Sequence, residues 1–158
     1  MGHEIIPNSK SCKIDGLRLT PLKRICDSRG SVMHFLKSDS LNYIKFGEAY
    51  FSTIKEGVIK GWKYHKILKQ NLCVPYGSVK IVVYDNRKKS NTYGVIDEIY
   101  LDNNENYFLL TMPSNLWYSF KCISEKFSII ANIIDNHHSI NETIIEPLNS
   151  KNIPYVWS

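Results

Sequence analysis

The sequence predicts a single all-β domain, and three observations support this prediction. Its 158 residues fit one domain, because domains usually contain roughly 100–200 residues. Apolar residues recur with a period of two or in short runs, as is typical of strands. Turn residues bound these runs, and no segment combines a sustained helical period with capping residues. About nine short strands at close spacing predict a β-sandwich, a jelly roll or a barrel.

The predicted strands follow one another with short polar turns between them. Residues 31–36 follow a turn at residues 27–30, and residues 48–54 begin after Gly47. In residues 78–84, alternation places three apolar side chains on one face. The best candidate for a helix, although a weak one, is residues 139–148. The remaining predicted strands are residues 58–65, 71–74, 93–101, 107–112 and 127–134.

Composition excludes several classes of protein. Hydrophobic residues make up 43% of the chain and charged residues 22%, which is close to the average for soluble domains and unlike a disordered chain. No stretch approaches the roughly 18 apolar residues of a membrane helix, so no membrane partner is expected. The N-terminus has no secretory signal pattern. The four cysteines are scattered without a CxxC pair, which favours reduced thiols and a cytoplasmic location.

Positive charge is concentrated in one part of the chain. Residues 55–89 contain nine basic and two acidic side chains, a net charge of +7, whereas the whole chain carries +5. This asymmetry favours an anionic partner, such as a nucleotide diphosphate or a nucleic-acid backbone. The alternative is that these lysines keep strand faces and turns solvated.

The most informative stretch is residues 57–65, Gly-Val-Ile-Lys-Gly-Trp-Lys-Tyr-His. On a strand, Lys63 and His65 share one face, and Trp62 and Tyr64 share the other. A lysine beside a histidine inside a small barrel would suit an anion clamp with an imidazole that titrates near neutral pH. The alternative is a barrel rim at which both polar groups reach water.

Several motifs together resemble the dTDP-4-dehydrorhamnose 3,5-epimerases. Residues 27–30 resemble the family's DxRG signature, and residues 57–65 its glycine-rich strand with a histidine. Residues 85–94 are similar to its D-x-R-x-x-S-x-T-x-G turn. The W-x-x-H element at residues 62–65 and the closing residues 153–157, Ile-Pro-Tyr-Val-Trp, resemble a shorter subgroup. The matches cover about residues 16–157 in the family's order.

This resemblance implies a cupin-type jelly roll, a double-stranded β-helix, that forms a homodimer. It also implies a role in nucleotide-sugar and cell-surface polysaccharide pathways. Long edge strands would need a cover, and pairing with a second copy is one way to provide it. The whole chain, residues 1–158, is then one domain with a core of about residues 16–157.

The family's proton-transferring residues are replaced in this sequence. Lys63 stands where the family has its basic histidine, and Tyr118 replaces the histidine of the AHGF segment. The family's acidic tyrosine falls at residues 130–132, Ile-Ala-Asn, and none of these can transfer a proton. The carboxylate that orients the base falls near Glu146. Three possibilities stay open: His65 acts as base with Tyr118 as the opposing acid, Lys63 itself acts, or catalysis has been lost.

Further residues match positions at which the family binds its substrate. Arg29 and Lys60 match phosphate- or sugar-binding positions, and Glu48 stands where the family has a glutamine that faces the sugar. Gln70 stands at the position of a lysine that contacts the substrate, and Trp117 could stack on a nucleotide base.

No metal and no cofactor are expected. The metal-binding positions of cupins correspond here to Lys63, His65, Gln70 or Lys69, and Tyr118, which is one imidazole among four places.

Three functions follow in order of preference. The first is an epimerase or isomerase of a nucleotide-linked 4-keto sugar of the dTDP-4-keto-6-deoxyhexose type, with altered catalytic residues. The second is a non-catalytic nucleotide-sugar-binding protein of the same pathway. The third is an oligonucleotide-binding β-barrel, which would show steep salt dependence. The order of the motifs counts against the third, so the expected partner is a nucleotide sugar and not a nucleic acid.

Overall fold

The protein is built from antiparallel strands. The structure, a computed structural model, describes residues 2–158, and these contain thirteen strands and no helix. No helix that could cross a lipid bilayer is therefore found among them. The strands are β1 (His3–Ile5), β2 (Arg18–Pro21), β3 (Arg24–Asp27), β4 (Gly30–Met33), β5 (Glu48–Lys55), β6 (Ile59–His65), β7 (Gln70–Tyr76), β8 (Ser78–Tyr84), β9 (Ile96–Asp102), β10 (Phe108–Met112), β11 (Trp117–Cys122), β12 (Phe127–Ile134) and β13 (Thr143–Ile145).

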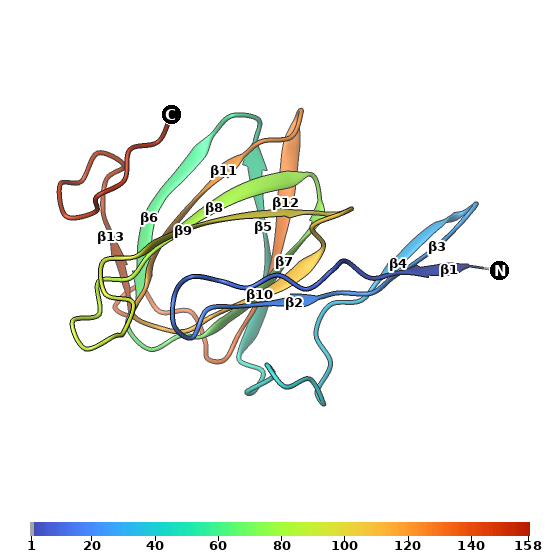
Figure 1. The fold of residues 1–158 in the computed structure, drawn as a ribbon, viewed down its shortest axis with the longest axis horizontal. Coiled ribbons are helices and arrows are strands. Elements are labelled where there is room, and N and C mark those ends of the chain that lie inside the picture. The colour runs from blue at the N-terminus through green and yellow to red at the C-terminus, as the bar shows by residue number, and fades with distance from the viewer. Residues whose placement is uncertain (1) are drawn as a thin grey trace.

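Two five-stranded sheets face each other (Figure 1). The first has the strand order β2-β10-β7-β12-β5, and the second has the order β13-β6-β11-β8-β9. A small third sheet, β1-β3-β4, extends away from them toward the N-terminus (Figure 1). The predicted all-β fold is confirmed, and sequence neighbours such as β5 and β6 lie in different sheets, as in a jelly roll.

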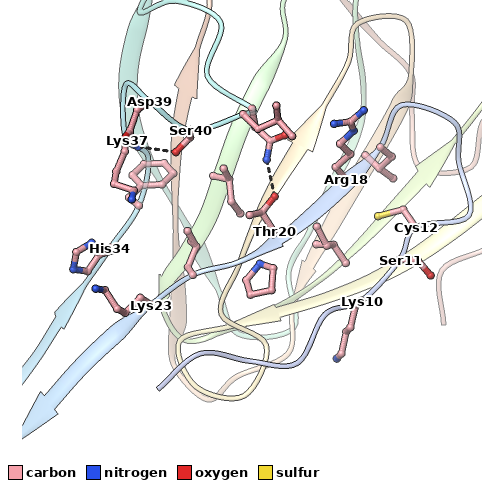
Figure 2. A pocket seen from close by; sticks show the side chains of 18 residues that line it. Lys10, Ser11, Cys12, Arg18, Thr20, Lys23, His34, Lys37, Asp39 and Ser40 are labelled. Atoms are coloured by element: carbon pink, nitrogen blue, oxygen red, sulfur yellow. Dashed lines mark hydrogen bonds between the residues drawn. The ribbon is translucent and has the colours of Figure 1, made fainter. Parts of the chain in front are cut away.

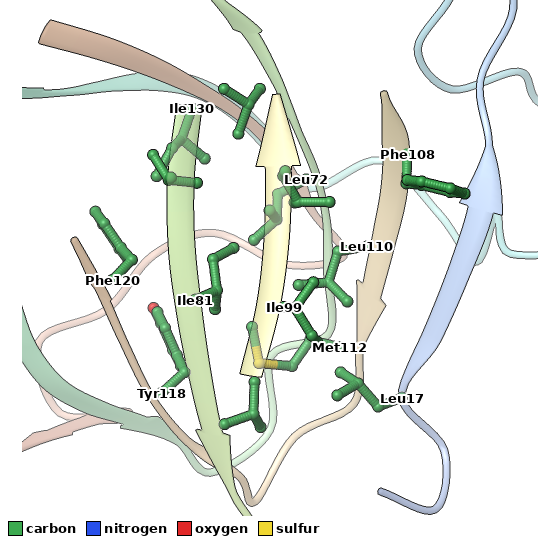
Figure 3. Packing of buried hydrophobic residues seen from close by; sticks show 14 of the residues in the cluster. Leu17, Leu72, Ile81, Ile99, Phe108, Leu110, Met112, Tyr118, Phe120 and Ile130 are labelled. Carbon is green, nitrogen blue, oxygen red and sulfur yellow. The ribbon is translucent and has the colours of Figure 1, made fainter. Parts of the chain in front are cut away.

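The main core lies between the two large sheets (Figure 3). The side chains that alternation assigned to one face of β8, Val79, Ile81 and Val83, are at most 1% exposed there. They meet Leu72 of β7 and Leu110 of β10 across the interface between the sheets. Burying such side chains contributes roughly 1.5–3 kcal/mol each, which makes this interface the principal source of stability.

Each large sheet is also covered on its outer face by a segment of the same chain. Residues 33–36 pack against Tyr107, Leu109 and Cys73 of the first sheet. The C-terminal residues 153–157 pack against Trp62 and Trp117 of the second sheet. Strands that are covered on both faces do not show a clear alternation of apolar and polar residues.

This burial on both faces explains why sequence analysis missed one strand. The whole of β11 was absent from the predicted strands, although five of its six residues are buried. The short strands β1, β2 and β3 were also missed, since three or four residues carry little periodic signal.

The predicted helix at residues 139–148 is wrong. Residues 143–145 form β13, which pairs with β6 through Thr143 opposite His65 and Ile145 opposite Lys63. The open edge of β6 supplies backbone partners that outweigh a weak local helical pattern.

The turn at residues 85–94 is held by a buried carboxylate. Asp85 is fully buried and accepts hydrogen bonds from Arg87, Ser90 and Thr92. Burial alone would raise the pKa of Asp85, but these donors together hold it well below its usual range. The motif that resembles the family's turn is therefore a structural element of this chain.

A bulge in β6 sets the orientation of two lysines. Between Tyr118 and Phe120 of β11, the pairing on β6 runs from Lys63 to Lys60, so β6 contains one additional residue. Such a bulge breaks the simple alternation of side chains. Lys60 and Lys63, which regular pleating would place on opposite faces, both point between the sheets.

Candidate functional site

A small cavity lies between the two large sheets, and its wall is formed by residues of β5, β6, β7, β11 and β12. Its volume is about 40 Å³, enough for a few water molecules. Its wall combines polar groups with apolar side chains of the core. The lining residues are Tyr50, Ser52, Lys63, Gln70, Leu72, Tyr118, Phe120, Ile130 and Asn132.

A chain of hydrogen bonds leads from a buried carboxylate to this cavity. Glu142 Oε2 lies 2.8 Å from His65 Nδ1, and His65 Nε2 lies 3.0 Å from the Tyr118 hydroxyl. The other oxygen of Glu142 accepts hydrogen bonds from the backbone N–H groups of Ile67 and Leu68 at 2.8 and 3.0 Å. The side chains of Glu142, His65 and Tyr118 are all less than 9% exposed. Glu142 is thereby fixed on the backbone, and it in turn orients the imidazole.

The surroundings of these groups define which of them carry protons. Burial lowers the pKa of His65, although the hydrogen bond and the charge of Glu142 oppose this effect. Burial raises the pKa of Tyr118 above its usual value of 10.0. Neutral His65 then donates a hydrogen bond from its Nδ1–H group to Glu142. Its Nε2 atom accepts a hydrogen bond from the Tyr118 hydroxyl. The arrangement has the form of a carboxylate–imidazole–hydroxyl relay that ends at the cavity wall.

Two lysines face the same space. Lys60 Nζ donates to Ser52 Oγ at 3.2 Å and to the Thr53 carbonyl at 2.6 Å. Lys63 lies in the cavity wall and belongs to none of the ion pairs of residues 2–158. Burial, and to a smaller extent the charge of Lys60, lowers the pKa of Lys63. The cavity therefore contains an amine without a carboxylate partner.

Amide and hydroxyl groups complete the wall. Asn132 donates to Gln70 Oε1 at 2.8 Å and to the Tyr50 hydroxyl at 3.1 Å. Gln70 and Asn132 are 2% and 5% exposed, which shows that they belong to the interior of the barrel. Such groups can bind sugar hydroxyls or a carbonyl oxygen.

The structure brings together five of the eight residues that sequence analysis selected. Lys63, His65, Tyr118, Gln70 and Lys60 all lie in or next to the cavity.

The other three selected residues lie outside the cavity wall. Glu48 accepts a hydrogen bond from the His138 backbone at 2.9 Å. Trp117 points to the opposite face of β11 from Tyr118. It therefore packs with Trp62 on the outer face of the second sheet. Arg29 is exposed on the β3–β4 turn and pairs with Asp27 at 2.6 Å.

Sequence analysis missed Glu142. The expected orienting carboxylate, Glu146, instead accepts a hydrogen bond from Asn152 at 3.2 Å, and Glu142 contacts His65. No sequence signal separates the two, since both fall in the short segment around β13 whose pairing with β6 decides their positions.

The geometry also changes the relation between His65 and Tyr118. Sequence analysis considered them as base and acid on opposite sides of a substrate, but they are hydrogen bonded to each other. They therefore lie on one side of the cavity as a single hydrogen-bonded unit. At the position expected for the family's acid, Ile130 and Asn132 face the cavity, and Ala131 packs with Cys73 and Leu109 on the outer face of the first sheet.

A larger hollow lies elsewhere in the molecule. A groove of about 750 Å³ runs between β2 and residues 34–42 (Figure 2). Its wall includes Arg18, Lys23 and His34, but none of the residues of the relay. The volume of a hollow alone does not identify the candidate site, because the polar relay ends at the small cavity.

A metal centre is not evident in the part of the chain that the structure describes. Among residues 2–158, no three histidine, cysteine, aspartate or glutamate side chains gather as metal ligands.

Replacing Gly47 with alanine is expected to disturb the relay from outside the cavity. A Cβ atom at Gly47 would lie 2.2 Å from Asn136 N and 2.4 Å from its Cα, so the backbone that leads to Glu142 would have to shift. We expect a loss of about 1–3 kcal/mol in the free energy of unfolding in urea, as in other overpacked sites. Exposed Lys45→Ala is the control. An unchanged stability of Gly47→Ala would show that the loop adapts without cost.

Acid is expected to destabilise the protein through His65. Because its pKa in the folded state lies below 6.5, the unfolded chain binds more protons than the folded chain as the pH falls below this value. The free energy of unfolding should therefore be highest near pH 7 and decrease toward about pH 5. Urea titrations at several pH values measure this. The change in the free energy of unfolding with pH should become smaller in His65→Gln and stay the same in the exposed control His137→Asn. An equal pH dependence in all three proteins would contradict this role of His65.

Known proteins resemble this chain in both fold and sequence. Residues 11–157 match the family described as dTDP-4-dehydrorhamnose 3,5-epimerase. A dTDP sugar isomerase from Desulfovibrio desulfuricans G20 is 34% identical and superimposes with a TM-score of 0.91. That alignment covers 94% of this chain and 95% of the other, so the cupin-type fold implied by the motifs is confirmed.

Two curated proteins are also similar. The spore coat polysaccharide biosynthesis protein SpsL of Bacillus subtilis is 30% identical over 112 residues, which cover 71% of this chain and 74% of SpsL. The probable low-salt glycan biosynthesis epimerase Agl13 of Haloferax volcanii is 26% identical over 154 residues, which cover 95% of this chain and 90% of Agl13.

Proposed function

Because the chain belongs to the dTDP-4-dehydrorhamnose 3,5-epimerase family, we propose that it is a cytoplasmic isomerase of a nucleotide-linked 4-keto sugar. The names of SpsL and Agl13 support a role in polysaccharide or glycan biosynthesis. The reaction is proton transfer at a carbon next to the C4 ketone. The free thiols of all four cysteines fit a reducing compartment.

The observation that carries this proposal is the relay from Glu142 through His65 to Tyr118. It ends in a cavity that also contains the side chain of Lys63. Proton abstraction next to a ketone needs a group that exchanges protons and a positive charge near the oxygen that becomes an enolate. Tyr118 provides the first of these and Lys63 the second, with Lys60 close by. The relay replaces the family's histidine and tyrosine with a different set of residues.

Each residue of the relay has a separate task. Tyr118 gives its proton to the carbon or takes one from it, and His65 accepts or returns the phenolic proton. Glu142 holds the imidazole in the tautomer that keeps Nε2 free to accept. Gln70 and Asn132 bind the polar groups of the ring.

Substrate binding requires the cavity to widen. A volume of about 40 Å³ is much smaller than a hexose ring, and typical ligand pockets enclose several hundred cubic ångströms. Tyr50, Ser52 and Lys63 are the half-buried polar residues of the wall. Of these, Tyr50 and Lys63 have long side chains that can move without opening the apolar core. We therefore expect these two side chains to change conformation when the sugar enters.

Deuterium exchange tests this function. The protein is incubated in D₂O with a dTDP-4-keto-6-deoxyhexose, and the C3 and C5 protons are followed by NMR. Loss of either signal that depends on the protein, and that is reduced in His65→Gln but not in exposed His137→Asn, is the expected result. Saturable binding without exchange would reject catalysis.

Such binding without exchange is the result expected from the second candidate, a nucleotide-sugar-binding protein. The small cavity and the absence of a proton-transferring group at residues 130–132 favour it. Calorimetric titration with the same sugar nucleotide, performed beside the exchange experiment, separates the two functions.

We also propose that the protein forms a homodimer. The sheet β1-β3-β4 leaves the outer edge of β4 unpaired, and Val32 on this strand is 62% exposed. Phe51 on the edge strand β5 is 77% exposed. Free edges and exposed apolar side chains are surfaces that proteins usually cover. Light scattering after size-exclusion chromatography should give twice the chain mass of 18.3 kDa; a monomer at micromolar concentration would reject the dimer.

A further inference from the structure

We propose that Lys63 is a nucleophile, and that its amine forms an iminium with the ketone of the substrate. This inference rests on the proposed function and deepens it: the substrate is activated through a covalent bond to Lys63 rather than as a free enolate. The compounds recognised would share a carbonyl group with a neighbouring C–H bond.

The position of Lys63 is the first argument. It lies half-buried in the wall of the cavity between the sheets, and no carboxylate forms an ion pair with it. An amine needs to lose its proton before it can attack a carbonyl, and a nearby carboxylate would oppose this by stabilising the ammonium. The charge of the neighbouring Lys60 acts in the opposite sense and lowers the pKa of Lys63.

The placement of Lys60 is the second argument. Its ammonium is anchored by Ser52 and Thr53 and points to the same side as Lys63 because of the bulge in β6. Desolvation and a neighbouring cation are the two conditions that activate a lysine for Schiff-base chemistry. Both conditions lower the pKa of Lys63, with burial the larger. A regular strand would have placed the two lysines on opposite faces.

The neighbouring relay is the third argument, because iminium formation needs proton transfer. Tyr118 is the residue of β11 that pairs with Lys63 in the sheet. The Lys63 ammonium first gives one proton to the relay, which holds it on His65. The neutral amine then attacks the ketone carbon, a C–N bond forms, and the carbonyl oxygen takes up two protons and leaves as water. One of these protons comes from the amine nitrogen and the other from Tyr118, which regains it through His65. Overall, one ammonium and one ketone give one iminium and one water, so no oxidant or further reactant is needed.

The iminium then makes the neighbouring C–H bond more acidic. Its positive nitrogen accepts the electron pair that remains when the proton leaves, and an enamine forms. Return of a proton to the carbon restores the iminium, and attack of water releases the ketone and the free amine. The relay can remove the proton, since its hydroxyl lies in the same wall. Inversion of the carbon then requires a proton on the opposite face of the ring, and water that enters the widened cavity supplies it.

Reductive trapping tests the covalent step. The full chain is mixed with dTDP-4-keto-6-deoxyglucose and sodium cyanoborohydride, which reduces iminium ions to stable amines. Intact-mass spectrometry should show one sugar-nucleotide adduct per chain, and peptide mapping should place it on Lys63. Lys63→Arg should reduce the adduct to background, and exposed Lys55→Arg should leave it unchanged. The map of the unaltered protein answers the question even if Lys63→Arg fails to fold.

A second variant tests the role of the neighbouring cation. In Lys60→Met, the pKa of Lys63 should rise, and each unit lowers the fraction of neutral amine about tenfold. The rate of trapping should therefore fall near pH 7 and recover at higher pH. A purely structural effect of Lys60→Met would lower the rate equally at all pH values, and this outcome would overturn the assigned role.

The outcomes separate this inference from the proposed function. Deuterium exchange without an adduct would leave the isomerase function standing and reject the iminium in favour of an enolate. An adduct on Lys63 without exchange would support the nucleophile and reject the isomerase. Adducts confined to other lysines, or neither adduct nor exchange, would reject the nucleophile.

Discussion

Replacing Tyr118 with phenylalanine is expected to reduce proton exchange at the sugar by about 100- to 10,000-fold, the range that a general acid or base contributes. The substitution removes the hydroxyl that connects His65 to the cavity and keeps the ring that packs in the main core. It tests the end of the relay with little change in packing. The rate of loss of the C3 and C5 NMR signals in D₂O is the measurement.

Tyr107→Phe is the matched control. Tyr107 is also a buried tyrosine with a hydrogen-bonded hydroxyl, which donates to the His34 carbonyl at 2.8 Å on the outer side of the first sheet. Its loss should cost about 1 kcal/mol of stability and leave exchange unchanged. If Tyr118→Phe exchanged protons as fast as the unaltered protein, Tyr118 would be a structural residue and Lys63 the remaining candidate for the base.

Replacing Glu142 with alanine is expected to produce the largest loss of stability, about 3 kcal/mol or more. Four donors lose an acceptor: the backbone N–H groups of Ile67 and Leu68, the imidazole of His65 and the hydroxyl of Thr143. Each buried donor that is left unsatisfied costs roughly 1–3 kcal/mol. Unfolding in urea, followed by circular dichroism, measures the change. Proton exchange should decrease together with it, because His65 is no longer oriented.

Glu146 offers a matched control four residues along the chain. Its carboxylate makes one exposed side-chain contact, to Asn152, so Glu146→Ala should change stability by less than about 0.5 kcal/mol. Glu142→Gln should lie between the two, since an amide oxygen can still accept from the backbone but no longer carries charge. Equal stability of the two alanine variants would show that Glu142 does not anchor the relay.

Much of the fold follows from the amino-acid pattern alone. Alternation in residues 78–84 identified β8 and the face that meets the core, because one side chain in two points to each side of a strand. The same rule placed Lys63 and His65 together and Trp62 and Tyr64 opposite them. Ordered motifs identified the family, since their spacing reflects a shared fold.

The composition of the site was decided by the tertiary structure. The bulge that brings Lys60 beside Lys63 is visible only in the pairing of β6 with β11, because an additional residue in one strand has no signature in these residue types. The choice of Glu142 over Glu146 depends on how β13 adds to the edge of β6. The hydrogen bond between His65 and Tyr118 joins residues 53 positions apart. Local sequence determines which residues can form strands and, where the pleat is regular, which face each side chain takes. Contacts between distant strands determine where the pleat is interrupted and which polar groups meet.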